Sequence, residues 1–396
     1  MSEWKKVKLG DLYTVHNGLS KSKDAFGRGW PFLSYSVVFK NFFLPERLES
    51  LVLTTEDERE SYSIKVGDVF ITRTSETPNE LGMSCVALRD YPDATYNGFC
   101  KRLRPITNSV YPRYIGFYLR TPAFRRNFEA ISGSMITRAS LRNEDLLAME
   151  IPLPPLPTQR RIAAVLGALD DKIENSRKIC ANLEAQAQAL FKSWFVDFEP
   201  FGGKMPSGWK MGKLGDIAEI TMGQSPDGDS LNEDDEGITF FQGRAEFGSR
   251  YPTKRLSTTE PKRMAKSGDV LLSVRAPVGD LNIALEDCCI GRGLAAIRSR
   301  DGAQSFIYYL LKTKKPEFDL YEGAGTIFGS INKEALHGLS AFSPDAKTLC
   351  RFDEVASSLD KMYHEKELES RALAATRDAL LSKLMSGEID VEKVAV

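Results

Sequence analysis

The strongest constraint on the fold is that the chain repeats its own landmarks. The string Trp-Lys-x-x-Lys-Leu-Gly-Asp occupies residues 4–11 and returns at residues 209–216, 205 positions later. Gly67-Asp68-Val69 is echoed 201 positions later by Gly268-Asp269-Val270, and Ser140-Leu141 is echoed 190 positions later by Ser330-Ile331. The landmarks keep their order while the spacing between them shrinks. We therefore interpret the chain as a duplicated scaffold whose two copies differ in the stretches between landmarks.

Each copy is expected to begin with a globular domain of mixed α/β (α+β) structure, over residues 1–157 and 198–342. Short runs of β-branched and aromatic residues alternate with turn residues in both, as is typical of short strands. One helix is expected in each domain, over residues 112–126 and 305–311. The clearest predicted strands are Val69–Thr72, Val86–Leu88, Ile238–Phe241, Val270–Val274 and Leu281–Leu285.

A long helix is expected after each globular domain. The proline-rich run Ile151–Pro157 cannot be helical throughout, so it should end the first domain and lead into a helix over residues 158–197. In the second copy, Ser343-Pro344-Asp345 resembles a helix start with Ser343 as the N-cap, which places the second helix within residues 343–396. The apolar stripe of this second helix is expected at Phe352, Val355, Leu359, Met362, Leu373, Leu380 and Leu384.

A helix of about 40 residues cannot bury such a stripe alone, since most helices of globular proteins have about 8–20 residues. The simplest arrangement is that the two long helices pack on each other as an antiparallel coiled coil. The alternative is that each helix packs only against its own globular domain, and the length of the helices disfavours it.

Signatures of catalysis are missing from the sequence. There is no Walker A motif, no Asn/Asp-Pro-Pro-aromatic string of the kind found in adenine methyltransferases, and no convincing carboxylate set of a metal-dependent nuclease. The six cysteines form no C-x-x-C pair and there are only three histidines, so no zinc site is expected. Residues 291–296 fit G-x-G-x-x-A, but we interpret them as a turn between two strands because no long helix follows. We expect no catalytic residues, no metal and no cofactor.

The sequence also predicts where the protein resides. No apolar run approaches the roughly 20 residues that a membrane span needs. The first six residues lack the apolar core of a secretory signal, and the cysteines are expected to be free thiols. The expectation is a cytoplasmic protein without a membrane partner.

The net charge of −1 excludes a globally basic nucleic-acid binder, but positive charge is concentrated locally. Residues 101–142 contain nine Lys and Arg against Glu129 alone, a net +8, and residues 244–275 contain eight against three acids, a net +5. Arginine suits both phosphate binding and bidentate reading of guanine. The alternative is a solvated surface neutralised by neighbouring acids, which the acidic stretch 227–236 could supply in the second copy.

These segments and the ends of the Gly-Asp-Val strands supply the candidate DNA-binding residues. Arg73 and Arg275, each following such a strand, are expected to read bases, and Arg102, Arg125, Arg126 and Arg138 to meet phosphates. The full set is Arg73, Thr74, Lys101, Arg102, Arg125, Arg126, Arg138, Gln242, Arg244, Arg275 and Arg292.

The order of these parts resembles the specificity subunit of Type I restriction-modification systems. The resemblance rests on the strings at 4–11 and 209–216, on Ile151–Ile162, on Trp194–Phe198 and on Leu381–Ile389, and it covers essentially the whole chain. The stretch Pro152–Ile162 and the duplicated layout are its most specific parts. The second copy departs from the pattern at Ser343-Pro344-Asp345, where the proline-rich run is replaced.

The resemblance implies a recognition subunit without catalytic activity. Residues 1–157 and 198–342 would be two target recognition domains, each reading one half of a bipartite, asymmetric site in double-stranded DNA. Residues 158–197 and 343–396 would be the spacer helices. A pseudo-two-fold would let one chain seat two modification (methyltransferase) subunits, with restriction (translocase and endonuclease) subunits added to the complex. The alternative function is a coiled-coil scaffold that binds proteins and not DNA.

Overall fold

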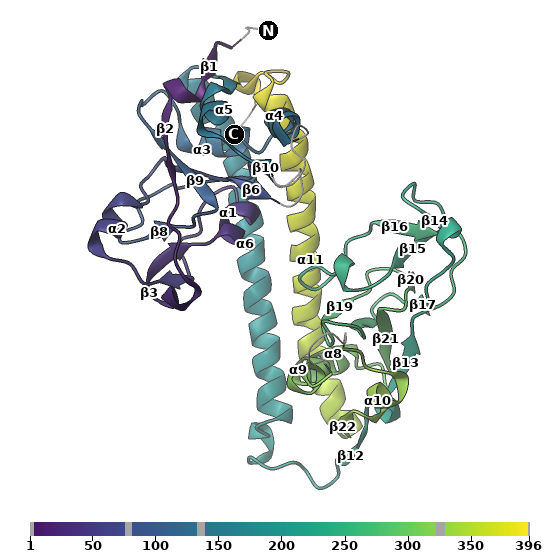
Figure 1. Cartoon of the computed structure of the whole chain (residues 1–396). Coiled ribbons are helices and arrows are strands. Elements are labelled where there is room, and N and C mark those ends of the chain that lie inside the picture. The colour runs from purple at the N-terminus through teal and green to yellow at the C-terminus, as the bar shows by residue number, and fades with distance from the viewer. Residues whose placement is uncertain (1–3, 76–80, 133–138, 322–328, 395–396) are drawn as a thin grey trace. The chain divides into compact units, whose positions relative to one another are not determined.

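The computed structural model describes residues 4–75, 81–132, 139–321 and 329–394. The chain divides into two compact units, one holding the residues up to Ser176 together with those from Glu369 onward, and the other holding Arg177–Leu368. Each unit contains one globular part and one half of each long helix. These helices are α6 (Leu156–Phe195) and α11 (Ala346–Met385) (Figure 1).

The globular part of the first unit is built on two small sheets. A four-stranded antiparallel sheet has the order β2-β9-β5-β7, a three-stranded sheet has the order β4-β3-β8, and β1 pairs with β11 and β6 with β10. The strands are β1 (Lys6–Lys8), β2 (Tyr13–Asn17), β3 (Phe26–Leu33), β4 (Leu51–Val52), β5 (Val69–Thr72), β6 (Thr74–Ser75), β7 (Ser84–Val86), β8 (Thr95–Tyr96), β9 (Cys100–Pro105), β10 (Ala139–Ser140) and β11 (Glu150–Pro152). The helices are η1 (Leu9–Asp11), η2 (Lys23–Ala25), α1 (Tyr35–Lys40), α2 (Glu56–Ser61), α3 (Pro112–Tyr118), α4 (Pro122–Ser132), α5 (Asn143–Ala148) and η7 (Val391–Lys393).

The second unit repeats this architecture. Its four-stranded sheet has the order β13-β21-β18-β19, its other sheet has the order β14-β16-β15-β20-β17, and β12 pairs with β22. The strands are β12 (Lys210–Lys213), β13 (Ala218–Met222), β14 (Leu231–Asn232), β15 (Ile238–Phe241), β16 (Leu256–Thr258), β17 (Met264–Ala265), β18 (Val270–Ser273), β19 (Leu281–Ile283), β20 (Cys288–Ile290), β21 (Leu294–Ser299) and β22 (Ser340–Ser343). The helices are η4 (Glu199–Phe201), α7 (Leu214–Ile217), η5 (Gly228–Ser230), η6 (Arg244–Glu246), α8 (Gln304–Thr313), α9 (Lys315–Asp319) and α10 (Lys333–Gly338).

The two copies turn into their central strands in the same way. Gly67 and Gly268 have φ angles of +86° and +85°, a left-handed conformation that glycine adopts at little cost. Their amides donate to the carbonyls of Ala87 and Ala284, both at 2.8 Å. The repeated Gly-Asp-Val string therefore marks one structural device, used once before β5 and once before β18.

The aspartate of each string is buried, and in both copies it binds a backbone amide and an arginine. Asp68 and Asp269 each accept the amide N–H of the residue three positions before them, at 2.7 Å. Each also forms an ion pair at 2.6 Å, Asp68 with Arg104 and Asp269 with Arg298. Arg104, which adds to the positive charge of residues 101–142, is thus occupied within the fold.

Most predicted strands are present and one predicted helix is wrong. β5 and β15 have the predicted bounds, while β7, β18 and β19 differ by one or two residues at their ends. The single helix expected over residues 112–126 is instead two helices, α3 and α4, separated at residues 119–121. Pro122 explains the break, because proline disfavours a helical residue before it and begins a new helix well.

In the first unit the two helix halves run antiparallel. Arg377 on α11 forms an ion pair with Asp170 on α6, at 2.6 Å, and Arg161 near the start of α6 donates to the carbonyl of Val391, beyond the end of α11. The apolar side of both halves also joins the core of the globular part, through Ile162, Leu166, Leu381 and Leu384 among others.

The second unit shows the same antiparallel pairing. The rings of Phe191 on α6 and Phe352 on α11 lie 5.8 Å apart, and the Cys180 thiol donates to the carbonyl of Tyr363. The expected α/β (α+β) class and the antiparallel packing of the long helices are therefore confirmed. The helices also pack against the globular parts, so burial of the apolar stripe is shared between both kinds of contact.

Two details of α11 differ from the prediction. Its N-cap is Asp345 and not Ser343, because the Asp345 carboxylate accepts the amide of Thr348 at 3.0 Å while Ser343 ends β22. Val355 and Met362 are each 49% exposed, whereas Ala356 and Tyr363 are buried. At these two positions the buried residue is one place later than predicted, while Phe352 and Leu384 are buried as predicted.

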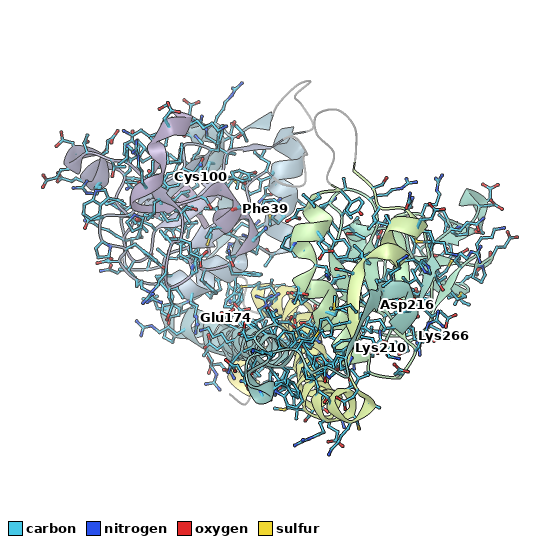
Figure 2. All side chains as sticks on the ribbon, turned by 90° about the horizontal axis from the view of Figure 1, so that it is seen from below. Phe39, Cys100, Glu174, Lys210, Asp216 and Lys266 are labelled. Carbon is cyan, nitrogen blue, oxygen red and sulfur yellow. The ribbon has the colours of Figure 1, made fainter. Side chains whose placement is uncertain are left out.

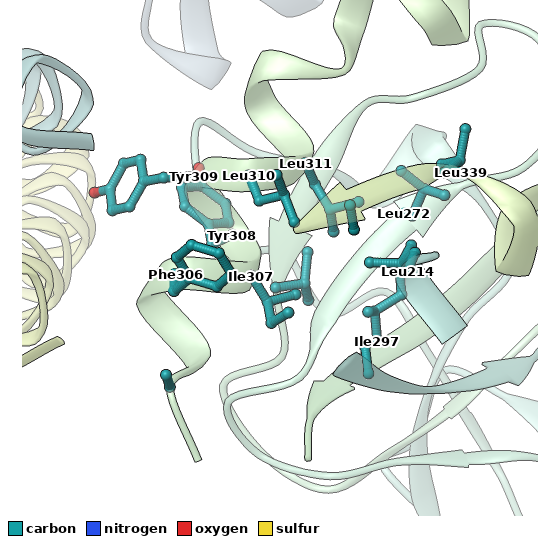
Figure 3. Packing of buried hydrophobic residues seen from close by; sticks show 14 of the residues in the cluster. Leu214, Leu272, Ile297, Phe306, Ile307, Tyr308, Tyr309, Leu310, Leu311 and Leu339 are labelled. Atoms are coloured by element: carbon teal, nitrogen blue, oxygen red, sulfur yellow. The ribbon is translucent and has the colours of Figure 1, made fainter. Parts of the chain in front are cut away.

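The core of the second unit packs α8 against the sheet and the helices. Figure 3 shows Phe306, Leu310 and Leu311 among leucines of the surrounding elements, with Tyr309 directed toward the long helices. The Tyr309 hydroxyl donates to Asp360 on α11 at 2.7 Å. Helix α8 therefore packs its aliphatic residues against the sheet and directs Tyr309 toward the long helices.

Arg250, just before β16, joins the globular part of the second unit to both helix halves. Its side chain is only 1% exposed and forms ion pairs with Glu184 on α6, at 3.2 Å, and with Asp360, at 2.5 Å. Its guanidinium also lies over the rings of Tyr308 and Tyr363, at 4.5 and 4.7 Å from their centroids. We call Arg250, Glu184 and Asp360 the junction cluster.

Among the described residues, no helix combines the length and the apolar character needed to cross a membrane.

Replacing Arg250 by methionine should destabilise the full chain by about 3–5 kcal/mol, because the largely buried Asp360 would lose the cation it pairs with and Glu184 would keep only Lys312. The control is Lys266→Met, which should destabilise the chain far less because its pair with Asp287 is exposed to solvent. Urea unfolding of the full chain measures both. Equal losses for the two variants would contradict the role of the junction cluster.

The junction cluster also predicts a dependence of stability on pH. Burial acts to raise the pKa of Glu184, but Arg250 and Lys312 outweigh it and hold this pKa below the ordinary value of 4.5. The contribution is therefore present above about pH 4.5 and is lost as the pH falls through the lowered pKa. Glu184→Gln should be less stable than the wild type at pH 7, and the difference in unfolding free energy should shrink on acidification below pH 4.5. A constant difference across that range would refute the assignment.

Candidate nucleic-acid interface

Three turns of the second unit converge on one groove. They are the turn after β15 (242–246), the turn after β18 (275–277) and the turn between β20 and β21 (291–293). The groove has a volume of about 490 Å³. Four of the sequence-predicted residues, Gln242, Arg244, Arg275 and Arg292, line it and are exposed.

Glycines let these turns approach one another closely. A Cβ on Gly291 would lie 2.9 Å from the Cα of Gln242, and a Cβ on Gly293 would lie 2.8 Å from the carbonyl oxygen of Gln242. The Gly291 amide donates to the carbonyl of Phe241 at 2.8 Å, and Val274 donates to the carbonyl of Gly293 at 2.9 Å. The string at 291–296 thus begins with a turn between two strands, as predicted, and enters β21 at Leu294. Its glycines serve to hold three turns together.

The four arginines on the groove differ in their partners. Arg244 forms an ion pair with Asp280, and Arg255 forms one with the buried Glu246 at 3.0 Å. The guanidinium groups of Arg275 and Arg292 are exposed and have no hydrogen bond or ion pair with any residue that the structure describes. These two cations are therefore available to a ligand.

The first unit has an equivalent surface with different chemistry. The hydrogen bond from Asn97 to the carbonyl of Leu33 matches that from Gly291 to Phe241, and strands β3 and β8 pair in parallel as β15 and β20 do. The residues that correspond by this register to Gln242, Arg244 and Arg292 are Ser34, Ser36 and Gly98. The Ser34 and Ser36 hydroxyls are hydrogen bonded to each other at 3.1 Å.

The equivalence that the sequence suggested between Arg73 and Arg275 is wrong by one residue. Thr74 pairs with Ser140, and Arg275 pairs with Ser330, which is the same landmark serine in the second copy. Thr74 therefore corresponds to Arg275. Arg73 corresponds to Val274 and is only half-exposed, with an Nε atom that is buried and without a hydrogen-bond partner.

Much of the +8 charge of residues 101–142 is used inside the first unit. Arg102 is 7% exposed and donates to the carbonyls of Ser61 and Ser63, the latter at 2.7 Å. Arg120 donates to four backbone carbonyls and Arg113 pairs with Asp171 at 2.7 Å. Burial lowers the pKa of Arg120 to about 10, so that it keeps its charge at neutral pH.

The remaining predicted residues of the first unit are divided. Lys101 is 5% exposed and donates to Asn17 and Asn143. Arg125 donates to the carbonyl of Leu81 and lies over the ring of Phe128. Arg126 on α4 is exposed. Arg138 lies outside the described residues. The structure thus brings the predicted residues of the second unit onto one groove, whereas Lys101, Arg102 and Arg125 of the first unit are engaged in hydrogen bonds of the fold.

Sequence reasoning missed Ser225 and Arg255, which also line the groove. It missed Ser34 and Ser36 as well, although an alignment of the two copies by strand register could have found them.

The residues that the structure describes contain no group of three or more His, Cys, Asp or Glu able to hold a metal ion. Cys100 lies in the interior of the first globular part, while Lys210, Asp216 and Lys266 lie on the outside of the second (Figure 2). Burial raises the pKa of Cys100 and of Cys288 to about 12, so these thiols are protonated and unreactive at neutral pH.

Because Arg102 is buried and Arg126 is exposed, their replacement by alanine should change the free energy of unfolding by different amounts. Arg102→Ala should destabilise the chain by about 1–3 kcal/mol, because two carbonyls lose their donor, whereas Arg126→Ala should change stability by about 0.5 kcal/mol or less. Thermal melting of the two variants measures this. A stable Arg102→Ala chain would show that its guanidinium is dispensable to the fold and would return it to the DNA-contacting candidates.

Comparisons with known proteins point to one family. The model of the Type I restriction modification DNA specificity domain matches residues 1–185 and 206–340. A Methanocaldococcus jannaschii protein that carries the name of the type I restriction enzyme MjaX specificity subunit is 29% identical over 98% of this chain and 94% of its own. The HindI specificity subunit of Haemophilus influenzae is 22% identical over 98% of this chain and 100% of its own.

A solved structure shares the fold. It is the S subunit of a Type I restriction-modification system from M. genitalium, with a TM-score of 0.60, 14% identity, and coverage of 96% of both chains.

Proposed function

Because this chain belongs to the Type I restriction modification DNA specificity family, we propose that it is the DNA sequence-recognition subunit of a Type I restriction-modification complex. The observation that carries the proposal is the groove of the second unit. There, three hydrogen-bonded turns hold exposed polar and cationic side chains, two of them arginines without a partner among the described residues. Such side chains suit both phosphates and base edges.

The two globular parts are proposed to read the two halves of a bipartite, asymmetric site. The proposed target recognition domains are residues 1–157 and 198–342, and the proposed spacer helices lie at 158–197 and 343–396. Support comes from the shared scaffold, whose equivalent turns carry different residues in the two copies. One scaffold with two different surfaces suits two different half-sites in one continuous molecule.

The DNA contacts are proposed to come from residues that are exposed or, like Arg73 and Thr74, half-exposed. In the second unit these are Gln242, Arg244, Arg275 and Arg292. In the first unit they are Arg73, Thr74 and Arg126, with Arg138 kept as a candidate from the sequence. Lys101, Arg102 and Arg125 are directed into hydrogen bonds of the fold, and they support the surface without facing DNA in this conformation.

The chain itself is proposed to be non-catalytic, with catalysis in partner subunits. Two modification subunits would bind the duplicated scaffold and restriction subunits would complete a cytoplasmic complex. Val355 and Met362 lie seven positions apart on α11 and are each 49% exposed. An exposed apolar pair of this kind on a long helix supports docking of a partner subunit there.

DNA recognition and a protein-only scaffold make different predictions about salt. If the complex of this chain with its modification subunits binds DNA through cations, the logarithm of its affinity should fall linearly with the logarithm of salt concentration. Fluorescence anisotropy with a labelled duplex between 50 and 200 mM salt measures the slope. Absence of binding at the lowest salt concentration would favour the protein-only scaffold.

The two-module proposal predicts separable half-sites. Replacing residues 1–150 by those of a relative whose residues facing α6 and α11 are compatible should change only one half of the methylated site. Methylation mapping of a host that carries the hybrid chain gives the result. A change in both halves would show that the two globular parts do not read DNA independently.

A further inference from the structure

Arg275 and Arg292 line one groove, each two residues beyond the paired residues Ser273 and Leu294 of the neighbouring strands β18 and β21. Arg275 pairs with Ser330, and the next residue, Ala276, donates to the carbonyl of Gly329 at 3.0 Å. Arg292 stands between the two closely packed glycines, and its amide donates to the Ser225 hydroxyl at 3.3 Å. The Cα positions of both residues are thus fixed while their side chains have no partner in the described part of the chain.

The other charges of the groove are already balanced. Asp280 compensates Arg244 and Glu246 compensates Arg255. The positive charge that a ligand meets therefore comes from Arg275 and Arg292. A guanidinium donates two parallel hydrogen bonds, which match the O6 and N7 acceptors of guanine in the major groove.

Phosphate binding needs charge but little precision, whereas a bidentate contact to a base needs a fixed anchor. The three turns supply such anchors. We propose that Arg275 and Arg292 read guanines in the half-site recognised by the second unit. This inference rests on the proposed function of the chain in DNA recognition, and it assigns base chemistry to one of the two half-sites.

The first unit lacks these cations at the equivalent positions. Thr74 stands in place of Arg275, and Gly98 in place of Arg292. The carbonyl of Thr74 accepts a hydrogen bond from the Tyr35 hydroxyl at 3.2 Å. A threonine hydroxyl such as that of Thr74 contacts either purines or pyrimidines, and Gly98 has no side chain. At these two positions the first half-site is therefore read without an arginine–guanine contact.

The test compares lysine and alanine variants of the two arginines in the full chain, assembled with its modification subunits. Lysine keeps the charge but loses the planar fork. Arg300→Lys is the matched control, because Arg300 is an exposed arginine at the opposite end of the strand β21, whose six residues span about 20 Å. Methylation of a plasmid library with randomised half-sites gives the preference at every base pair.

In the wild type, the half-site of the second unit should show a strong preference for G·C at two base pairs. Arg275→Lys and Arg275→Ala should each weaken that preference at one of these pairs by roughly 10- to 100-fold, the range of one bidentate contact. The Arg292 variants should do so at the other pair. The preferences of the remaining half-site and of the Arg300→Lys complex should stay unchanged.

A different result separates this inference from the proposed function. Uniform weakening at all sequences in the alanine variants, with recovery in the lysine variants, would show phosphate contacts and overturn the base assignment while DNA recognition stands. A wild-type complex that methylates no specific site would overturn the proposed function itself. Melting temperatures of the variants, expected within a few degrees of the wild type because both side chains are exposed, verify that they are folded.

Discussion

In each unit one arginine lies where the globular part meets the long helices and pairs with a carboxylate of those helices, and this contact helps to position the globular part. In the second unit the arginine belongs to the globular part and its carboxylate partner Asp360 to α11. In the first unit the arginine is Arg377 of α11 and the carboxylate is Asp170 of α6, 190 positions before Asp360. The Arg377 guanidinium lies 4.8 Å from the centre of the Phe42 ring. Phe42 corresponds to Arg250, because the carbonyl of Phe42 accepts the amide of Val86 in β7 and the carbonyl of Arg250 accepts the amide of Ile283 in β19. The charge pair has therefore been retained while the segment that supplies its arginine has changed. A partly buried pair of this kind is costly to break, which restrains the globular part on its helix halves.

This restraint allows the turns above it to vary without loss of the scaffold. The central strands, the glycine turns before them and the buried aspartates are equivalent in both units, and these elements supply the apolar core. The turns after β3 and β15 contribute little to that core, so their side chains can differ freely. Ser34 and Gln242 stand at the same backbone position and offer different hydrogen-bonding groups. Separating stability from recognition in this way is what a duplicated reader of two different sequences requires.

The sequence predicted most of the fold because landmarks and periodicity depend on local chemistry. The β-branched and aromatic runs after the repeated Gly-Asp strings located β5 and β18, and the proline-rich run located the start of α6. The left-handed glycine before each of the two strands was found only in the structure. The exposure of Val355 could not be predicted in the same way. Val355 and Ala356 are both apolar, and the choice between them depends on the fit of side chains from α6 and the globular part. The predicted equivalence of Arg73 and Arg275 was wrong for a related reason. A one-residue difference after a strand reverses the face on which a side chain lies, and only the strand register reveals it.

Local charge was a poorer guide to the interface than backbone geometry. The most basic segment of the sequence lies in the first unit, yet Arg102, Arg104 and Arg120 are directed to carbonyls and to a buried aspartate. Arginine suits this task because its five donors can satisfy several backbone oxygens at once. A count of charged residues cannot distinguish an arginine that is hydrogen bonded within the fold from one that is free to bind a phosphate. The second unit, whose basic segment has the lower net charge, has acids that compensate some cations and leave Arg275 and Arg292 exposed without a partner among the described residues. What marks an interface in such a chain is therefore the cation that the fold holds in place and does not use.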